Sequence, residues 1–456
     1  MFIFTVLNPK IDNRYMHRES TKKLRFKETQ VGKDFTSEKL TSYSGLTVIN
    51  DYVNHLGLFK ALDNVFVTLK NNATKVLNIQ IFSAIIFASL CGINRLSKIS
   101  KFTEDPLVCK LLGITKRLDD SNIKIRLSKL GQNGANKLLE TSLRFTNKWV
   151  KKCGLSRITI DCDSTEQTVF GHQQGASKGY NPKNKGKLSY HPLVCFLSEM
   201  KIVLNSWFRT GSAYTSNGIV EFMKQTLAAL PSTVKKIFFR ADSGFFNGNL
   251  FDLLEDIGHE YLVKAKLTNT LKQRLSEQKW IKKCSHIAVC EFEYQAHGWS
   301  KARKMYGVRV IKEYVEKEFF GKIEIIPVYE YFCYCTNLKG LSTIKIHALY
   351  GERAECENWI ENTKNQLYAG QTITNDFHVN DILWQLSVMA YNISVLMRYE
   401  SDYKTWKQEP KSFREWFILV PGKVVTNARK TTVKMSKHYI YAKQWVHLTG
   451  KIPIAA

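Results

Sequence analysis

The chain has 456 residues, of which 67 are Lys or Arg and 40 are Asp or Glu, so its formal net charge is +27. Hydrophobic residues make up 44% of the chain and aromatic residues 12%, which is enough for packed cores and excludes disordered and fibrous classes. A basic excess spread along the whole chain indicates a polyanionic partner, most often nucleic acid.

Several other protein classes are disfavoured by motif and spacing. The longest apolar stretch, 79–93, is interrupted by Gln80 and Ser83 and is shorter than the roughly 20 residues of a membrane span. The ten cysteines form no C-x-x-C pair, the histidines have no zinc-site spacing, and no phosphate-binding glycine loop is present. We therefore expect a cytoplasmic, nucleoid-associated protein without a membrane partner or a nucleotide cofactor.

The first part of the chain divides into an arm and a helical region. Residues 1–44 are polar and basic, which predicts a basic arm. Residues 45–150 carry helical periodicity and predict an N-terminal helical domain. Its lysines and arginines could line a DNA-facing side or form an ordinary solvated helix face, and the sequence leaves both open.

Residues 151–267 predict the first part of a mixed α/β core. Short β-branched runs at 158–161, 193–197 and 202–208 predict three adjacent strands. Helical and strand patterns then alternate at 217–230, 236–241, 249–257 and 261–266. The order β-β-β-α-β-α-β is that of an RNase H-like α/β core, a mixed sheet flanked by helices.

The second half of the chain interrupts and then resumes this core. Residues 268–345 alternate apolar and polar side chains, which predicts a β-rich insertion of antiparallel strands. Residues 346–400 return to helix and predict the second part of the core. Residues 401–456 hold eleven Lys or Arg against three Asp or Glu and predict a basic C-terminal region.

Acidic residues mark the ends of two predicted strands. Asp161 and Asp163 alternate onto one face at the end of the first strand, and Asp242 ends the strand at 236–241. If these strands are neighbours, the carboxylates meet at one edge of the sheet. Acidic residues at strand ends are also common as ordinary solvent-exposed groups. A third acidic residue is therefore needed to indicate a functional site.

That third residue lies on the helix expected from Ala348 to about Leu367. Four side chains there fall within roughly 60° of one another on one helix face: Tyr350, Arg353, Glu357 and Lys364. The ordinary interpretation is a surface helix with ion pairs. The stripe also contains the components of a phosphate clamp around a metal ligand, and two Asp with one Glu suit two Mg²⁺ or Mn²⁺ ions better than zinc.

These motifs resemble those of bacterial insertion-sequence transposases of the DDE superfamily, in the cut-and-paste group with a Y-x2-R-x3-E-x6-K signature. The segment 350–364 matches that signature at all four positions, DCDST resembles the first-Asp element, and Arg240-Ala-Asp-Ser-Gly-Phe245 resembles the second-Asp element. The resemblance implies that Asp163, Asp242 and Glu357 are the catalytic metal ligands, with Asp161 a weaker substitute for Asp163. It also implies that Tyr350, Arg353 and Lys364 bind phosphates.

A Gly-, Asn- and Lys-rich segment, 171–193, resembles a loop of one subgroup of these enzymes. Its lysines are suited to DNA phosphates beside the proposed metals, although a solvated loop would look the same: Lys183, Lys185 and Lys187. The family also stacks a flipped base on an aromatic side chain of the insertion. Trp299, Tyr329 and Tyr331 are candidates for that role, but aromatic residues on strands more often pack in cores.

The resulting hypothesis is a DNA transposase that binds the terminal inverted repeats of its own insertion sequence as a homodimer and moves the element into target DNA. The resemblance implies end cleavage, hairpin formation and opening, and strand transfer. One alternative is an RNase H-like nuclease without strand transfer. The other is a non-cutting DNA-binding protein derived from a transposase.

Overall fold

The computed structural model of the chain describes residues 31–68, 76–179, 181, 184–213, 217–320, 322–367, 369, 374–428 and 430–453. Its internal contacts divide the chain into two units, residues 1–38 and residues 39–456, and the second forms one compact unit. Most of the predicted basic arm, residues 1–30, lies outside the described residues. Within 31–38 the chain contains neither a helix nor a strand.

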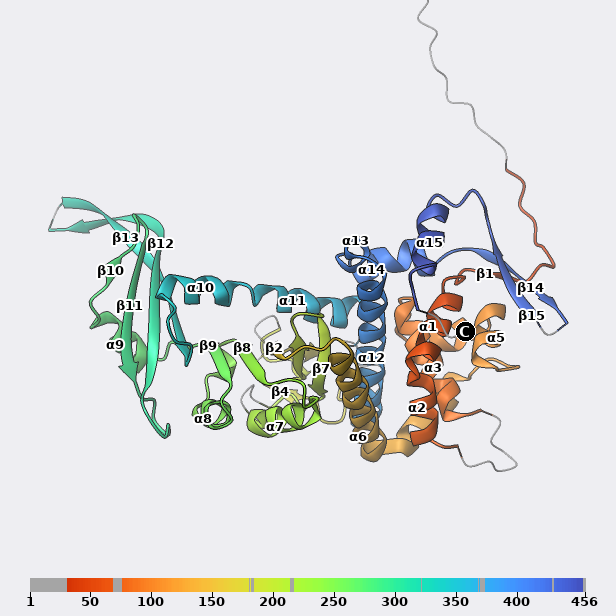
Figure 1. The fold of residues 1–456 in the computed structure, drawn as a ribbon, viewed down its shortest axis with the longest axis horizontal. Coiled ribbons are helices and arrows are strands. Elements are labelled where there is room, and N and C mark those ends of the chain that lie inside the picture. Colours follow the sequence, from red (N-terminus) through yellow and green to blue (C-terminus); the bar gives the residue numbers. More distant parts are fainter. Residues whose placement is uncertain are drawn as a thin grey trace, which may run out of the picture. The chain divides into compact units, whose positions relative to one another are not determined.

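The centre of the compact unit is a nine-stranded mixed sheet with the order β10-β11-β12-β13-β9-β8-β2-β6-β7 (Figure 1). The core strands are β2 (Arg157–Ser164), β6 (Leu193–Leu197), β7 (Ile202–Trp207), β8 (Lys236–Ala241) and β9 (Glu260–Lys264). β8 runs parallel to both β2 and β9, whereas β6 runs antiparallel to β2 and to β7. The predicted α/β fold with a mixed sheet is thus confirmed.

The helices between the core strands begin and end within two residues of the predicted ranges 217–230 and 249–257. α7 (Ile219–Ala229) stops just before Pro231, whose ring cannot continue a helix. α8 (Gly248–Asp256) begins at Asn247, whose side chain accepts a hydrogen bond from the backbone N–H of Leu250. These two helices connect β7 to β8 and β8 to β9, so they allow the parallel pairing of the strands that carry the acidic residues.

The predicted β-rich insertion continues the core sheet. Its elements are α9 (Asn269–Ser276), β10 (Ile281–Lys282), β11 (Ile287–Tyr294), β12 (Arg303–Phe319) and β13 (Lys322–Thr336). The strands are antiparallel, as the alternation predicts. β13 also pairs with β9, with Tyr334 opposite Lys264, so insertion and core share one sheet.

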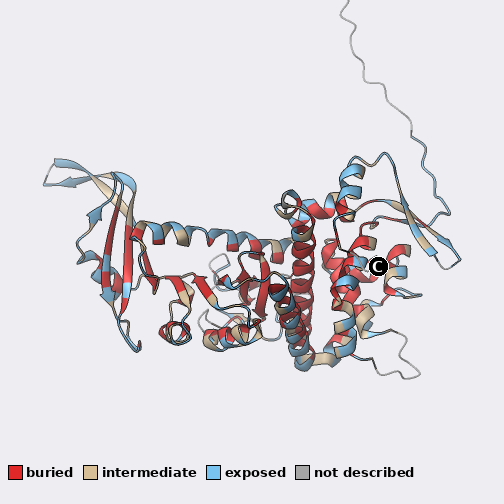
Figure 2. Cartoon of the chain, viewed as in Figure 1, coloured by how far each residue is buried: buried red, intermediate tan, exposed pale blue. Residues whose placement is uncertain are grey.

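A bundle of helices lies beside the sheet. It contains α1 (Leu46–Leu56), α2 (Leu58–Val65), α3 (Asn78–Leu90), α4 (Leu96–Phe102), α5 (Pro106–Leu112) and α6 (Asp120–Lys152). α12 (Phe377–Ser401) packs against α3 and α6 on one side and against β7 on the other. It is buried along most of its length (Figure 2), so it joins the helical bundle to the sheet. Among the described helices, none combines the length and apolar character needed to cross a membrane.

The remaining elements form two small sheets and the C-terminal region. β3 (Gln167–Thr168), β4 (Ser177–Lys178) and β5 (Leu188–Tyr190) make one sheet next to the end of β2. β1 (Leu40–Thr41), β14 (Gly422–Asn427) and β15 (Lys430–Met435) make the other. α13 (Tyr403–Trp406), α14 (Pro410–Phe413) and α15 (Ala442–Thr449) complete this region. The β1–β14 pairing brings residues from the two ends of the compact unit together.

The helix predicted from Ala348 to about Leu367 is divided. α10 (Thr343–Gly351) and α11 (Ala354–Glu361) are separated by a turn, and a π-helical turn, Asn362–Gln366, follows α11. The prediction of one regular helix was therefore wrong. An interruption and a wider turn change the angular spacing that a regular helix would give the four signature residues.

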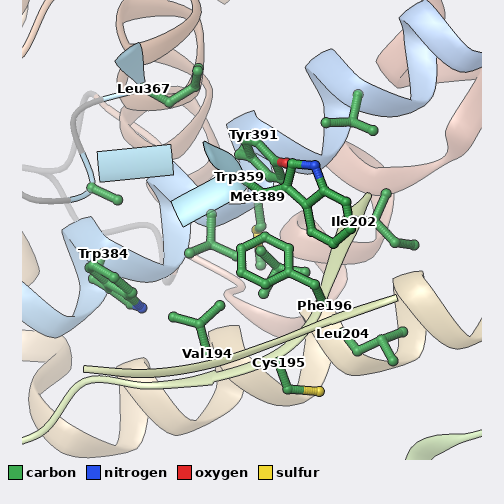
Figure 3. Packing of buried hydrophobic residues seen from close by; sticks show 14 of the residues in the cluster. Val194, Cys195, Phe196, Ile202, Leu204, Trp359, Leu367, Trp384, Met389 and Tyr391 are labelled. Carbon is green, nitrogen blue, oxygen red and sulfur yellow. The ribbon is translucent and has the colours of Figure 1, made fainter. Parts of the chain in front are cut away.

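One buried cluster holds α11 on the sheet. Trp359 of α11 lies 5.6 Å, ring centre to ring centre, from Phe196 of β6 (Figure 3). Phe196 also contacts Tyr391 of α12, at 6.1 Å between the ring centres. All three side chains are almost fully buried. This packing fixes the position of the helix that carries Glu357 relative to the strand that carries Asp163.

Burial destabilises the charged form of Asp381, an acidic residue of α12. Its pKa is raised to about 6 by burial, and the hydrogen bond from Gln385 only partly opposes this shift. Glu140, Arg209 and His378 line the same cavity of about 380 Å³. The folded protein therefore binds a proton at Asp381 more tightly than the unfolded chain does. The contribution of Asp381 to the free energy of unfolding falls as the pH rises from about 4 to about 6, where the carboxyl group must lose that proton.

We therefore expect Asp381→Asn to raise the free energy of unfolding by about 1–2 kcal/mol at pH 7.5, with a smaller gain at pH 4.5. Chemical denaturation of both proteins at the two pH values tests this. An equal difference at both values would show that the carboxylate is not the cause.

Candidate active site

Two aspartates lie side by side at one edge of the sheet. Asp163 is the second-last residue of β2, and Asp242 directly follows β8. These strands run parallel, with Cys162 opposite Ala241, so the two aspartates are the next pair in the register. Carboxyl ends of parallel strands share one sheet edge, and residues 79 positions apart in the chain meet there.

Each aspartate is held by a local backbone hydrogen bond. Oδ1 of Asp163 accepts from the N–H of Ser164 at 2.8 Å, and Oδ1 of Asp242 accepts from the N–H of Gly244 at 2.9 Å. The second bond caps a short 3-10 turn, Ser243–Phe245. One carboxylate oxygen of each residue is thus used to orient the side chain.

Arg353 links the first aspartate to the glutamate on α11. Its Nη2 lies 2.7 Å from Oδ2 of Asp163, and its Nη1 lies 3.7 Å from Oε1 of Glu357. The side chain of Arg353 is only 5% exposed, whereas that of Glu357 is 71% exposed. The guanidinium therefore occupies the space between two carboxylates that the sequence predicts to be metal ligands.

Burial and neighbouring charges both shift the pKa values of Asp163 and Arg353. Burial raises the pKa of Asp163 to about 6; Arg353 opposes the shift and Asp242 adds to it. Burial also disfavours the charge on Arg353, but Asp163 and other neighbours outweigh burial and raise the pKa of the guanidinium. The Nε atom of Arg353 is buried without a hydrogen-bond partner among the described residues. The pair is close and electrostatically favourable, but it leaves one donor unused.

Tyr350 and Lys364 flank this centre. Burial raises the pKa of the Tyr350 phenol, with smaller effects of Arg353 and of the three carboxylates, so it lies within electrostatic range of all of them. Nζ of Lys364 donates to Oγ1 of Thr165 and to the backbone oxygen of Glu166, each at 2.7 Å. Lys364 therefore connects the π-helical turn to the segment that leaves β2, a contact that sequence spacing could not indicate.

Asp161 has a different environment from Asp163. Its side chain is fully buried, and its two oxygens accept hydrogen bonds from Nε and Nη2 of Arg240 at 2.8 and 2.9 Å. Ser198 donates to the same carboxylate. Nη1 of Arg240 extends to Glu352, at the turn between α10 and α11, at 3.0 Å. Asp161 thus belongs to a network that is buried at Asp161 and Arg240 and extends to the exposed Glu352, and no sequence signal identified Arg240 or Glu352 as members of it.

The other predicted residues are distributed around the site. Lys185 and Lys187 are exposed on the segment between β4 and β5, whereas Lys183 lies outside the described residues. Trp299 is buried between Phe246 and Phe251, with ring centres 5.0 and 5.5 Å away, so it packs in a core.

The donor set suits a hard divalent cation. Within the described part of the chain, no three Asp, Glu, His or Cys side chains are already close enough to hold a metal ion together. Two carboxylates are nevertheless adjacent at the sheet edge, and the third contacts the same guanidinium as the first. Carboxylate oxygens are the ligands that Mg²⁺ and Mn²⁺ prefer. In the structure, the guanidinium of Arg353 supplies the positive charge between Asp163 and Glu357.

The aspartates are thus adjacent at the ends of the parallel strands β2 and β8, and the acidic helix α11 packs against β2, which is the arrangement expected of an RNase H-like core. The family model "Transposase DDE domain group 1" matches residues 24–455. The chain therefore belongs to this family of DDE transposases, which are DNA-acting enzymes that generally use divalent metal ions.

Other comparisons give less detail. No curated protein matches the sequence. Among solved structures, the fold is similar to that in a cryo-EM structure of the piggyBac transposase synaptic complex with hairpin DNA. The two share 11% sequence identity with a TM-score of 0.44, and the similarity covers 83% of this chain and 81% of that chain.

Proposed function

We propose that this transposase excises and reinserts its own insertion sequence by cutting at terminal inverted repeats. Asp163, Asp242 and Glu357 hold two Mg²⁺ or Mn²⁺ ions in each active site. The observation that carries this assignment is the shared guanidinium of Arg353, which contacts Asp163 and Glu357 beside the adjacent Asp242. Bound metal ions would stabilise the attacking and leaving oxygens of a phosphodiester displacement.

The cationic side chains around the carboxylates would bind DNA phosphates. Arg353 would leave Asp163 free to bind a metal ion and would turn to a phosphate oxygen, which would also satisfy its buried Nε. Tyr350 and Lys364 bind phosphates near the cut. The exposed Lys185 and Lys187, with Lys183, contact the backbone of the same DNA end. Glu357 must turn from its exposed position toward the two aspartates for the ligand set to close.

The reaction needs no nucleotide cofactor because every step replaces one oxygen on a phosphorus atom by another. Water first displaces a 3′-oxygen at the element end, which frees a 3′-OH and leaves a 5′-phosphate. That hydroxyl attacks a phosphodiester of the opposite strand and displaces the 3′-oxygen of the flanking DNA, which forms a hairpin. A second water hydrolyses the hairpin phosphodiester and frees the 3′-OH again, and this 3′-OH then attacks a target phosphodiester and displaces its 3′-oxygen. The helical domain at 45–150 binds the inverted repeats, and two copies of the chain pair two ends.

A cleavage assay with the purified full chain tests this proposal. DNA carrying the gene's own flanking sequence is incubated with Mg²⁺, Mn²⁺ or EDTA, and the products are separated on denaturing gels. We expect nicks and hairpins at discrete inverted-repeat positions with either metal and none in EDTA. A plasmid integration assay should then detect strand transfer.

Two outcomes would contradict the proposal in different ways. Metal-dependent nicks at no preferred position, without joined products, would indicate a nuclease without strand transfer. Salt-sensitive DNA binding without cleavage in either metal would indicate a DNA-binding protein that no longer cuts.

A further inference from the structure

The outer part of the β12–β13 hairpin lacks a covering partner among the described residues. β11 pairs with β12 only as far as Val310, and β9 pairs with β13 only from Tyr334 onward. Residues 312–320 and 322–330, which we call the ribbon, therefore pair almost only with each other. A two-stranded ribbon is marginally stable in water by itself, and its two edges are open. Figure 2 shows the ribbon as mostly exposed.

One face of the ribbon is both apolar and acidic. The cross-strand pairs Tyr314–Pro327, Glu316–Ile325 and Glu318–Ile323 place these six side chains on that face, and none of the six is Lys or Arg. Tyr314, Ile323 and Ile325 are 63%, 70% and 68% exposed. Neither Glu316 nor Glu318 forms an ion pair with another described residue. In a chain of charge +27, this acidic face is suited to a basic protein surface and unsuited to DNA.

The C-terminal region contains a matching groove. A cavity of about 610 Å³ lies between the end of β15 and α15, and we call it the α15 groove. Six of the residues that line it are Met435, Lys437, Tyr439, Lys443, Trp445 and Val446. Packing holds one of the residues that line the groove in place, because the Trp445 ring stacks on Phe417 at 5.6 Å between ring centres.

The charge of the groove is opposite to that of the ribbon face. No Asp or Glu occurs anywhere after Glu415, whereas Lys437 and Lys443 line the groove. Apolar side chains of the ribbon could enter the groove while Glu316 and Glu318 meet these lysines. Figure 1 draws the ribbon and α15 at opposite ends of the sheet and helical bundle, so one chain does not supply both partners of such a contact.

We propose that the acidic face of the ribbon docks in the α15 groove of a second copy of this chain. The contact is made twice in a symmetric pair, since each copy donates a ribbon and receives one. The inference rests on the proposed function, because it assigns the protein surfaces that hold two end-bound copies together. It does not require the ribbon or the groove to touch the cleavage site.

Two charge-reversal variants of the full chain test the contact. Glu316→Lys with Glu318→Lys makes the ribbon face basic, and Lys437→Glu with Lys443→Glu makes the groove acidic. Each variant alone would bring like charges together, so we expect at least about a tenfold loss of the complex that contains two protein copies and two DNA ends. Light scattering after size exclusion, with the end DNA present, measures that complex.

Mixing the two variants in equal amounts is the decisive measurement. A mixed pair joins a basic ribbon to an acidic groove and an acidic ribbon to a basic groove, so we expect the paired complex to return to within about threefold of wild type. Glu324→Lys, on the opposite ribbon face beside Lys317, is the matched control and should leave pairing unchanged. Recovery in the mixture also shows that both variants are folded.

Three results would overturn the inference. They are normal pairing by either double variant, failure of the mixture to recover, and loss of single-end DNA binding in the groove variant, which would make DNA the occupant. The proposed function is judged separately by wild-type cleavage. A wild-type protein that cuts and pairs ends while both variants pair normally would refute only the ribbon contact.

Discussion

We expect the replacement of Asp163 or Asp242 by Asn, or of Glu357 by Gln, to lower the rates of end cleavage, hairpin formation and strand transfer by at least about a thousandfold. All these steps use one site, so no intermediate product should accumulate. Each substitution removes one metal-binding charge at nearly constant volume, and each residue borders the same small region at the ends of β2 and β8. Gel separation of labelled end DNA measures each product.

Glu361→Gln is the matched control for the glutamate, because it changes the same charge four residues later at the end of α11. It should cleave within about twofold of wild type, and all four variants should still bind single ends. Normal cleavage by any one of the three active-site variants would remove that residue from the proposed ligand set. Equal loss in the Glu361 variant would point to damage of the helix.

The second large effect concerns stability. Asp161→Asn should lower the free energy of unfolding by about 3–5 kcal/mol, because it leaves the buried Arg240 guanidinium without its main counter-charge. Arg157→Ala is the control on the same strand. Its ion pair with Glu260 is 2.7 Å long, but the arginine side chain is 60% exposed, so the loss should be below about 1 kcal/mol.

Urea denaturation with and without Mg²⁺ tests the assignment of Asp161 to the supporting network. The loss of stability should be the same in both conditions, since neither partner is a proposed metal ligand. At a temperature where the Asp161→Asn protein remains folded, it should retain measurable cleavage. Complete inactivity of the folded protein would place Asp161 among the catalytic carboxylates.

Sequence patterns predicted the core of the fold because local chemistry determines its elements. Apolar β-branched runs and the helix stop at Pro231 operate within a few residues, and the structure has the predicted strands and helices in the predicted order. The sequence left open whether the strands that carry Asp163 and Asp242 are neighbours. In the structure β8 pairs with β2 in parallel, after the crossover through α7, and this pairing places the two aspartates together.

Other features depended on contacts that no local pattern encodes. The interruption between α10 and α11 coincides with the ion pairs of Arg353 to Asp163 and of Arg240 to Glu352, which tie the turn to the sheet. Regular helical spacing could not predict it. Trp299 was likewise a candidate for stacking on DNA by residue type alone, and its burial against Phe251 depends on packing between distant segments.

By itself, the sequence determined the class of the protein and the order of its core elements, and it supplied the three acidic residues that are proposed as metal ligands, since these follow from charge, periodicity and motif. Only the tertiary structure decided that Asp161 is a buried ion-pair partner while Asp163 faces Arg353. Both aspartates alternate onto the same face of one strand, so their local patterns are identical. Their environments differ because Arg240 and Arg353 approach them from segments far away in the chain, and charge pairs of that kind exist only after folding.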